Sequence, residues 1–160
     1  MTNKKLSRLI DRANKPNNKF PKVAISDTID LTCIGINGEY AIFYLLKSKG
    51  QYVGIAYYTK CKKDVHVYIK PAYRRHGIAY EALKDFILPH ILRGGCWFYI
   101  TAISKAGKSL MEKLPTTFTE YKDYWVDHEN FQEFPESEWY CIADEMTEKL
   151  GLESMYYWWY

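Results

Sequence analysis

One stretch of the chain decides the fold, residues 65–79, which reads Val65-His66-Val67-Tyr68-Ile69-Lys70-Pro71-Ala72-Tyr73-Arg74-Arg75-His76-Gly77-Ile78-Ala79. Its first five residues are mostly β-branched or aromatic, which is typical of a strand, and Pro71 ends that strand. Residues 77–88 then carry apolar side chains at helical spacing, so a helix is predicted to begin at Gly77. The stretch therefore predicts a strand, a short basic loop and a helix in succession.

The loop between this strand and this helix is predicted to bind an anion. The first amides of a helix have no acceptor within it, and the helix dipole places partial positive charge there. Gly77 and Ala79 have little or no side chain, so a diphosphate can approach the backbone closely. Arg74 and Arg75 add fixed positive charge at the same place.

Short strands precede this stretch. Asn37-Gly38 is a strong hairpin signal between two runs of β-branched and aromatic residues. Two further turns, at residues 47–50 and 60–63, separate the runs that follow. The pattern predicts an antiparallel meander of four strands, at residues 31–36, 39–46, 51–59 and 64–69.

The chain after the basic loop alternates between helices and strands. Pro89 is expected to kink or end the helix that begins at Gly77, and Gly94-Gly95 to close the turn after it. Further elements are predicted as a central strand at 96–102, a helix at 105–114, strands within 118–125 and a last helix capped by Ser137.

These elements predict an α/β (α+β) fold, with a mixed, mostly antiparallel central sheet flanked by helices. We expect one domain over residues 1–160. Residues 1–30 form an N-terminal helix (3–13) and a loop, and residues 116–160 form C-terminal strands, a helix and an aromatic tail. The five aromatics at 156–160 are too apolar to stay exposed, so they should pack on this domain or across a homodimer.

Composition narrows the class of protein. With 48% hydrophobic and 26% charged residues, the chain is neither disordered, collagen-like nor a coiled coil. No run reaches the ~18 apolar residues of a membrane span, and the four widely spaced cysteines lack zinc or redox spacing, so a soluble, cytoplasmic protein without a metal is expected. Residues 1–80 carry 15 lysines and arginines against 5 acidic residues, whereas residues 81–160 carry 7 against 14. The basic first half favours an anionic ligand, although a self-complementary contact would also explain it.

The stretch Arg74-Arg75-His76-Gly77-Ile78-Ala79 resembles the cofactor signature of the GNAT superfamily of acyl-CoA N-acyltransferases, Arg/Gln-x-x-Gly-x-Gly/Ala after a strand. The order of helix, central strand and helix that follows also matches, so the resemblance covers about residues 51–118. It implies that acetyl-CoA is the co-substrate and that the acetyl group passes to a primary amine. The acceptor is left open between a small molecule, a protein and a charged tRNA.

The resemblance also implies roles for individual residues. The backbone of Val67, Tyr68 and Ile69 would pair with the pantetheine arm, and Ser104 stands where the family often has an asparagine that contacts the cofactor. The pyrophosphate would be held by the loop and helix start, Arg74, Arg75, His76, Gly77, Ile78, Ala79 and Tyr80. Lys105 and Lys108 are further candidates for the CoA phosphates, or simply solvated lysines.

Two features depart from the family pattern. The usual general-acid tyrosine of the later helix is replaced by Met111, so Tyr99 or Tyr121 is the candidate to protonate the leaving thiolate. The hairpin at Asn37-Gly38 also replaces the helices that family members place between their first strands, so acceptor specificity is not carried over.

Among the histidines, His66 is the candidate general base, because its ordinary pKa of about 6.5 suits proton transfer near neutrality. A strand histidine without a catalytic role is the competing interpretation. His76 is assigned to the cofactor, and His90 and His128 to the surface. A backbone amide near Ile69 is expected to polarise the thioester carbonyl.

Two other functions remain open from the sequence. A nucleic-acid-binding module would use the basic first half and stacking platforms offered by Tyr40, Tyr44, Tyr52, Tyr57, Tyr58 and Tyr68. A GNAT-fold protein that binds CoA without turnover would explain Met111.

Overall fold

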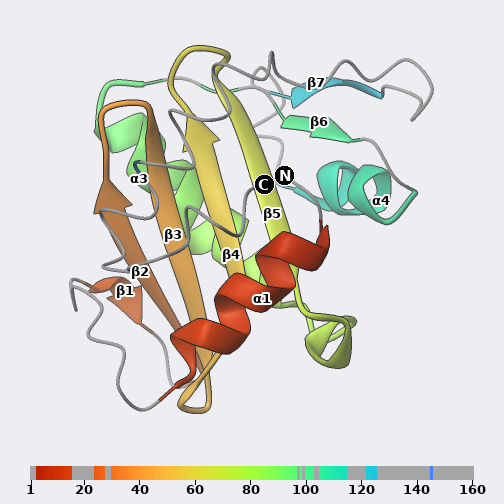
Figure 1. The fold of residues 1–160 in the computed structure, drawn as a ribbon. Helices are drawn as coiled ribbons and strands as arrows, with labels where there is room; N and C mark the ends of the chain where they lie inside the picture. The colour runs from red at the N-terminus through yellow and green to blue at the C-terminus, as the bar shows by residue number, and fades with distance from the viewer. Residues whose placement is uncertain are drawn as a thin grey trace.

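A five-stranded antiparallel sheet forms the centre of the computed structural model, and its strands follow one another in chain order (Figure 1). The structure describes residues 3–15, 24–27, 30–96, 98, 100–102, 105–114, 122–125 and 145. The strands are β1 (Ala24–Asp27), β2 (Leu31–Asn37), β3 (Ala41–Ser48), β4 (Gln51–Thr59) and β5 (Asp64–Ile69). The predicted four-strand meander is confirmed as β2 to β5. The edge strand β1, which pairs with β2, was not predicted.

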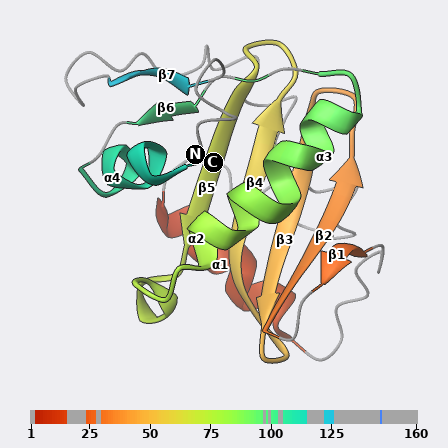
Figure 2. The same ribbon diagram turned by 180° about the vertical axis from the view of Figure 1, so that it is seen from behind.

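Helices cover both faces of this sheet (Figures 1 and 2). On one face lies α1 (Asn3–Ala13), the predicted N-terminal helix, whose buried Leu6, Leu9 and Ile10 pack with alternate strand residues such as Phe43. The other face packs against the helical run 78–93, in a second cluster that includes Tyr44. Because both faces are covered, every residue of β3 from position 41 to 46 is buried.

Pro89 does not end the helix, which was one of its two predicted effects, and the predicted kink stays a prediction. The helical run 78–93 continues through this residue. It comprises α2 (Ile78–Glu81), a π-helical segment η2 (Ala82–Ile87) and α3 (Leu88–Arg93). The Leu88 N–H donates to the Leu83 carbonyl, five residues back, just before the proline. The wider π turn leaves room for the proline ring, so the helix is not broken there.

Glycines end this run as predicted. Gly95 has a φ of 77°, in the left-handed region that glycine adopts without strain. The Cys96 N–H donates to the Ile91 carbonyl (3.2 Å) and the Gly95 N–H to the Leu92 carbonyl (3.0 Å), which satisfies the last carbonyls of the helix.

The rest of the described chain lies beyond β5. It comprises β6 (Ile100–Ala102), α4 (Lys105–Lys113) and β7 (Lys122–Trp125), of which β6 and β7 pair in a separate two-stranded parallel sheet. These elements fall within the predicted strands and helix, but the prediction of a central strand at 96–102 is wrong for the described residues, because β6 pairs with β7 and not with the five-stranded sheet. The helix predicted from Ser137 and the tail 156–160 lie outside the described residues. In the described part of the chain, no helix has the length and apolar character needed to cross a membrane.

Candidate anion-binding site at the end of strand β5

Strand β5 is the outer strand of the five-stranded sheet, with β4 on one side. The Lys70 N–H donates to the Val53 carbonyl (2.9 Å), and Tyr68 lies opposite Ile55. Since hydrogen-bonded pairs alternate along an antiparallel ladder, the backbone groups of Val67 and Ile69 point away from β4. On that side β6 contacts β5, although in the described structure the two strands belong to different sheets (Figure 1). Among the described strands, none pairs with this outer edge of β5.

A tight turn follows this edge. Pro71 ends the strand as predicted and begins a short 3-10 helix, η1 (Pro71–Tyr73), in which the Tyr73 N–H donates to the Lys70 carbonyl (2.9 Å). The ammonium of Lys70 pairs with the carboxylate of Asp11 on α1. The start of the basic loop is thus attached both to the strand and to the N-terminal helix.

Two residues of the loop adopt left-handed backbone conformations just before the helix. Arg75 has a φ of 66° and Gly77 a φ of 75°, and residues 74–77 are all exposed. The helix begins at Gly77, whose carbonyl accepts the Glu81 N–H (3.0 Å). No described atom lies within 4 Å of the place where a Cβ of residue 77 would stand, so the space above this backbone is open. Exposed amides at a helix start are an arrangement that binds anions.

The two arginines of the loop differ in what they contact. The Nε of Arg74 donates to the Ile69 carbonyl (2.8 Å), and its guanidinium carbon lies 5.4 Å from the centre of the Tyr68 ring. The side chain of Arg75 is exposed at the turn of the loop. The sequence assigned both arginines to the anion, whereas the structure gives Arg74 partners within the protein.

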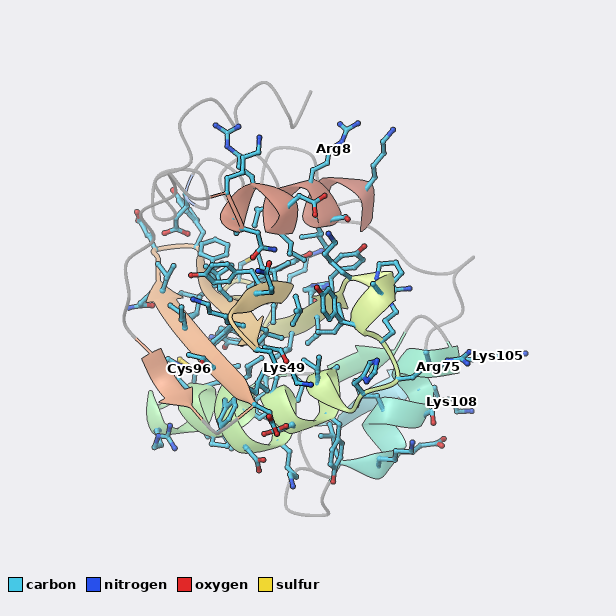
Figure 3. The ribbon with its side chains drawn as sticks, turned by 90° about the horizontal axis from the view of Figure 1, so that it is seen from below. Arg8, Lys49, Arg75, Cys96, Lys105 and Lys108 are labelled. Atoms are coloured by element: carbon cyan, nitrogen blue, oxygen red, sulfur yellow. The ribbon has the colours of Figure 1, made fainter. Side chains whose placement is uncertain are left out.

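Two lysines of α4 extend the basic surface. Lys105 and Lys108 are exposed, and α4 packs against α2, the first turn of the helix after Gly77. Figure 3 shows Arg75, Lys105 and Lys108 on the same side of the molecule, with Arg8 of α1 on another side and directed away from the sheet. The anion site is therefore flanked by positive charge from two separate segments.

The remaining residues of the predicted pyrophosphate segment divide between surface and core. His76 is exposed, while Ile78, Ala79 and Tyr80 are partly buried against the core cluster under the helix. These three residues can offer backbone amides to an anion, but their side chains belong to the packing of the helix. Ser104, Tyr99 and Tyr121 lie outside the described residues.

His66, the candidate base, lies on the face of β5 that α1 covers. Val65, Val67 and Ile69 pack toward the helical run 78–93 and Tyr68 toward α1, which is the alternation that the sequence predicts. The His66 ring stacks on Tyr57 of β4, with ring centres 4.6 Å apart.

Burial lowers the pKa of His66 to about 4. Although the residue as a whole is only partly buried, its Nε2 atom is shielded from solvent, and it is the ring's environment that sets this pKa. Such an imidazole is neutral at pH 7 but is a weak proton acceptor, which does not favour the role of general base.

The structure corrects the predicted exposure of two sets of side chains, the tyrosines and His90. Of the six tyrosines considered as stacking platforms only Tyr40 is largely exposed (46%), because the other five pack in the two core clusters or under the helices. His90, assigned to the surface, is half-buried: its Nδ1 hydrogen-bonds the Tyr44 hydroxyl (3.0 Å), and burial lowers its pKa.

A carboxylate at the far end of the sheet was not predicted from the sequence. Glu145 is buried, and its carboxylate accepts backbone N–H groups of the β2–β3 turn, those of Glu39, Tyr40 (2.8 Å) and Ala41 (3.1 Å). Nothing in the acidic C-terminal half distinguishes this glutamate from its neighbours. In the described part of the chain, no group of three or more histidine, cysteine and acidic side chains forms a metal site.

Comparisons of the chain with protein-family models, with curated proteins and with solved structures find no match. Function is therefore inferred from the chemistry of the chain's own residues.

Proposed function

We propose that the chain is an N-acetyltransferase of the GNAT type, which transfers the acetyl group of acetyl-CoA to a primary amine. The observation that carries this proposal is the junction at residues 69–78. There an open strand edge meets an exposed basic loop, whose two left-handed residues lead directly into a helix.

The parts of acetyl-CoA suit the parts of this junction. An extended pantetheine arm adds to a sheet edge as a further strand would. The outward backbone groups of Val67 and the N–H of Ile69 face the side from which it would pair, whereas the Ile69 carbonyl accepts from Arg74. The diphosphate suits the amides from Arg75 to Tyr80, where the helix start carries partial positive charge. Arg75, Lys105 and Lys108 supply the counter-charge.

The reaction proposed is direct transfer. The lone pair of a neutral amine attacks the thioester carbonyl carbon, a C–N bond forms, and the C–S bond breaks to release CoA as its thiolate. The amine loses its surplus proton to water. A thiol with a pKa near 8.5 is a tolerable leaving group as its anion, so the reaction does not depend on a general acid. In this scheme the Ile69 N–H, on the open edge, donates to the oxygen that becomes negative.

Binding of acetyl-CoA tests the proposal through thermal unfolding. At 100 times its Kd, acetyl-CoA should stabilise the wild type by about 2.7 kcal/mol. That corresponds to a rise in Tm of about 5–10 °C, at about 2–4 °C per kcal/mol. Gly77→Asp places a negative side chain where the diphosphate approaches, so it should abolish the rise.

Gly50→Asp is the matched control for this experiment. Gly50 has a φ of 80° and, like Gly77, no described neighbour near its Cβ position, so an aspartate carries a similar backbone strain at both sites. Gly50 lies in the β3–β4 turn, and its variant should keep the full rise in Tm with acetyl-CoA. A rise of the same size in Gly77→Asp would contradict the proposed site.

A second assay separates an enzyme from a protein that binds CoA without turnover. Free thiol released from acetyl-CoA, measured with a panel of primary amines, should increase with amine concentration and stay at background in Gly77→Asp. Binding without amine-dependent thiol release would leave only the cofactor-binding part of the proposal. Burial of five of the six tyrosines removes the stacking platforms on which the nucleic-acid alternative depended.

A further inference from the structure

One peptide group at the end of β5 is held from both sides. It joins Ile69 to Lys70: its carbonyl accepts the Arg74 Nε–H (2.8 Å), and its N–H donates to the Val53 carbonyl (2.9 Å). Hydrogen bonds in a chain polarise one another, so each of these two bonds strengthens the other. The plane of this peptide is therefore fixed by a charged donor on one side and by the sheet on the other.

The Arg74 side chain has a second partner in the same strand. Its guanidinium lies over the Tyr68 ring at 5.4 Å, within the range of a cation–π interaction. Tyr68 is buried and its backbone is paired with β4, so this ring is a fixed support. Both contacts fold Arg74 back onto the strand that the chain has just left.

The neighbouring arginine has the opposite arrangement. At Arg75 the backbone turns left-handed, and the side chain is exposed on the side of the molecule that also carries Lys105 and Lys108 (Figure 3). A left-handed conformation costs an arginine of the order of 1 kcal/mol or more. Both arginines are exposed, but Arg74 contacts Ile69 and Tyr68, whereas Arg75 lies on the side of Lys105 and Lys108.

We propose that the two arginines have different roles: Arg74 is a positioning residue that fixes the Ile69–Lys70 peptide, and Arg75 is the arginine that meets the phosphate. The role of Arg75 rests on the proposed function. A consequence follows for the ligand. Since the Ile69 carbonyl already accepts from Arg74, we expect a ligand along this edge to pair at residue 69 with the N–H and to present an acceptor there. A thioester carbonyl oxygen is such an acceptor.

The test compares Arg74→Met with Arg75→Met, which remove the same group from adjacent positions. Without any ligand, hydrogen exchange of the Lys70 amide is followed by NMR. Loss of a charged hydrogen-bond partner of this peptide should accelerate exchange about tenfold or more in Arg74→Met and leave it unchanged in Arg75→Met. The Ile55 amide, further along the same ladder, reports that the sheet stays intact.

With acetyl-CoA and an amine, the two variants should differ again. Arg75→Met should weaken acetyl-CoA binding several-fold and reduce its dependence on salt, because a charge contact is lost. Arg74→Met should lower kcat about tenfold while changing the Kd for acetyl-CoA less than threefold, with the wild-type salt dependence. Arg74→Lys keeps the charge but lacks the planar Nε donor, and should resemble Arg74→Met more than the wild type.

The results that overturn the inference are distinct from those that overturn the proposed function. Wild-type exchange at the Lys70 amide in Arg74→Met would refute the positioning role. Equal, salt-dependent losses of acetyl-CoA affinity in both variants would make Arg74 a phosphate contact instead. Failure of the wild type to bind acetyl-CoA would overturn the proposed function and the role of Arg75, while the exchange comparison still decides the role of Arg74.

Discussion

His66 should make the stability of this protein depend on pH between about 6.5 and 4. Burial lowers the pKa of its imidazole to about 4, against 6.5 for an unperturbed histidine. Between these two values the unfolded chain binds a proton that the folded protein does not. Stability therefore falls as the pH falls through this window, and the contribution of the neutral ring is fully present only above pH 6.5.

The size of the effect follows from the width of the window. Each unit of pKa difference corresponds to about 1.4 kcal/mol, so the full loss by pH 4 is about 3 kcal/mol. A domain of this size has a free energy of unfolding of about 5–15 kcal/mol, so a loss of this size is easily measured. His90, whose pKa burial also lowers, acts in the same direction.

Urea unfolding at pH 7.5, 6.5, 5.5 and 4.5 isolates the contribution of His66 when the wild type is compared with His66→Gln. Glutamine is polar but does not titrate, so the wild type should lose stability relative to this variant as the pH falls, by most of the 3 kcal/mol at pH 4.5. His76→Gln, at an exposed imidazole, is the control and should follow the wild type. A difference between the wild type and His66→Gln that stays constant across the series would refute the reasoning.

Two further contacts give expected losses of stability. Gly38→Ala should cost about 1–3 kcal/mol, because the new Cβ would overlap the Glu145 carboxyl group and would expel the carboxylate from the β2–β3 turn. Urea unfolding measures this loss, and the same loss in a Glu145→Ala background would show that the carboxylate is not its cause. Tyr44→Phe should cost about 1 kcal/mol through loss of the hydrogen bond to His90. An unchanged urea midpoint in Tyr44→Phe would count against that bond.

The sequence was most informative where turns are specified by residue type. The predicted bounds of β4 and β5 agree with the structure at both ends, because the lysine-rich turn at 60–63 and Pro71 interrupt clear runs of β-branched and aromatic residues. Strand β1 was missed because its four residues follow a proline- and asparagine-rich stretch and show no alternation of their own. Its pairing depends on β2, which local sequence does not reveal.

The burial of the strand tyrosines could not be predicted, because it depends on helices that pack on both faces of the sheet. Tyr57 and Tyr58 are adjacent, so they lie on opposite faces of β4, and alternation predicts that one of them is exposed. Both are buried, because α1 covers one face and the run 78–93 the other. For the same reason the surroundings of His66 were not predictable: its low pKa depends on α1, more than fifty residues earlier in the chain.

The sequence motif alone does not distinguish the roles of the adjacent Arg74 and Arg75. Two identical residue types carry no signal to distinguish an internal contact from an external one, and the sequence accordingly gave both to the anion. The contacts in the structure make the distinction: Arg74 bonds the Ile69 carbonyl and lies over the Tyr68 ring, whereas Arg75 is exposed in a left-handed conformation. These contacts arise where the loop closes onto the end of β5, after the turn at Pro71–Tyr73.

The conformation of Arg75 also bears on the proposal that this loop binds an anion. Lys49 and Lys63 are the other non-glycine residues with positive φ in the described chain, and each lies in a tight turn between antiparallel strands. Hairpin geometry accounts for those two, because turns that match the twist of the strands require left-handed residues. Arg75 lies between a 3-10 turn and a helix, where no hairpin imposes such a conformation. Its strain coincides with an exposed helix start and with the outer edge of β5, which pairs with no other described strand. The strain at Arg75 is a cost to the unliganded protein, and contacts with the proposed extended anionic ligand would offset it.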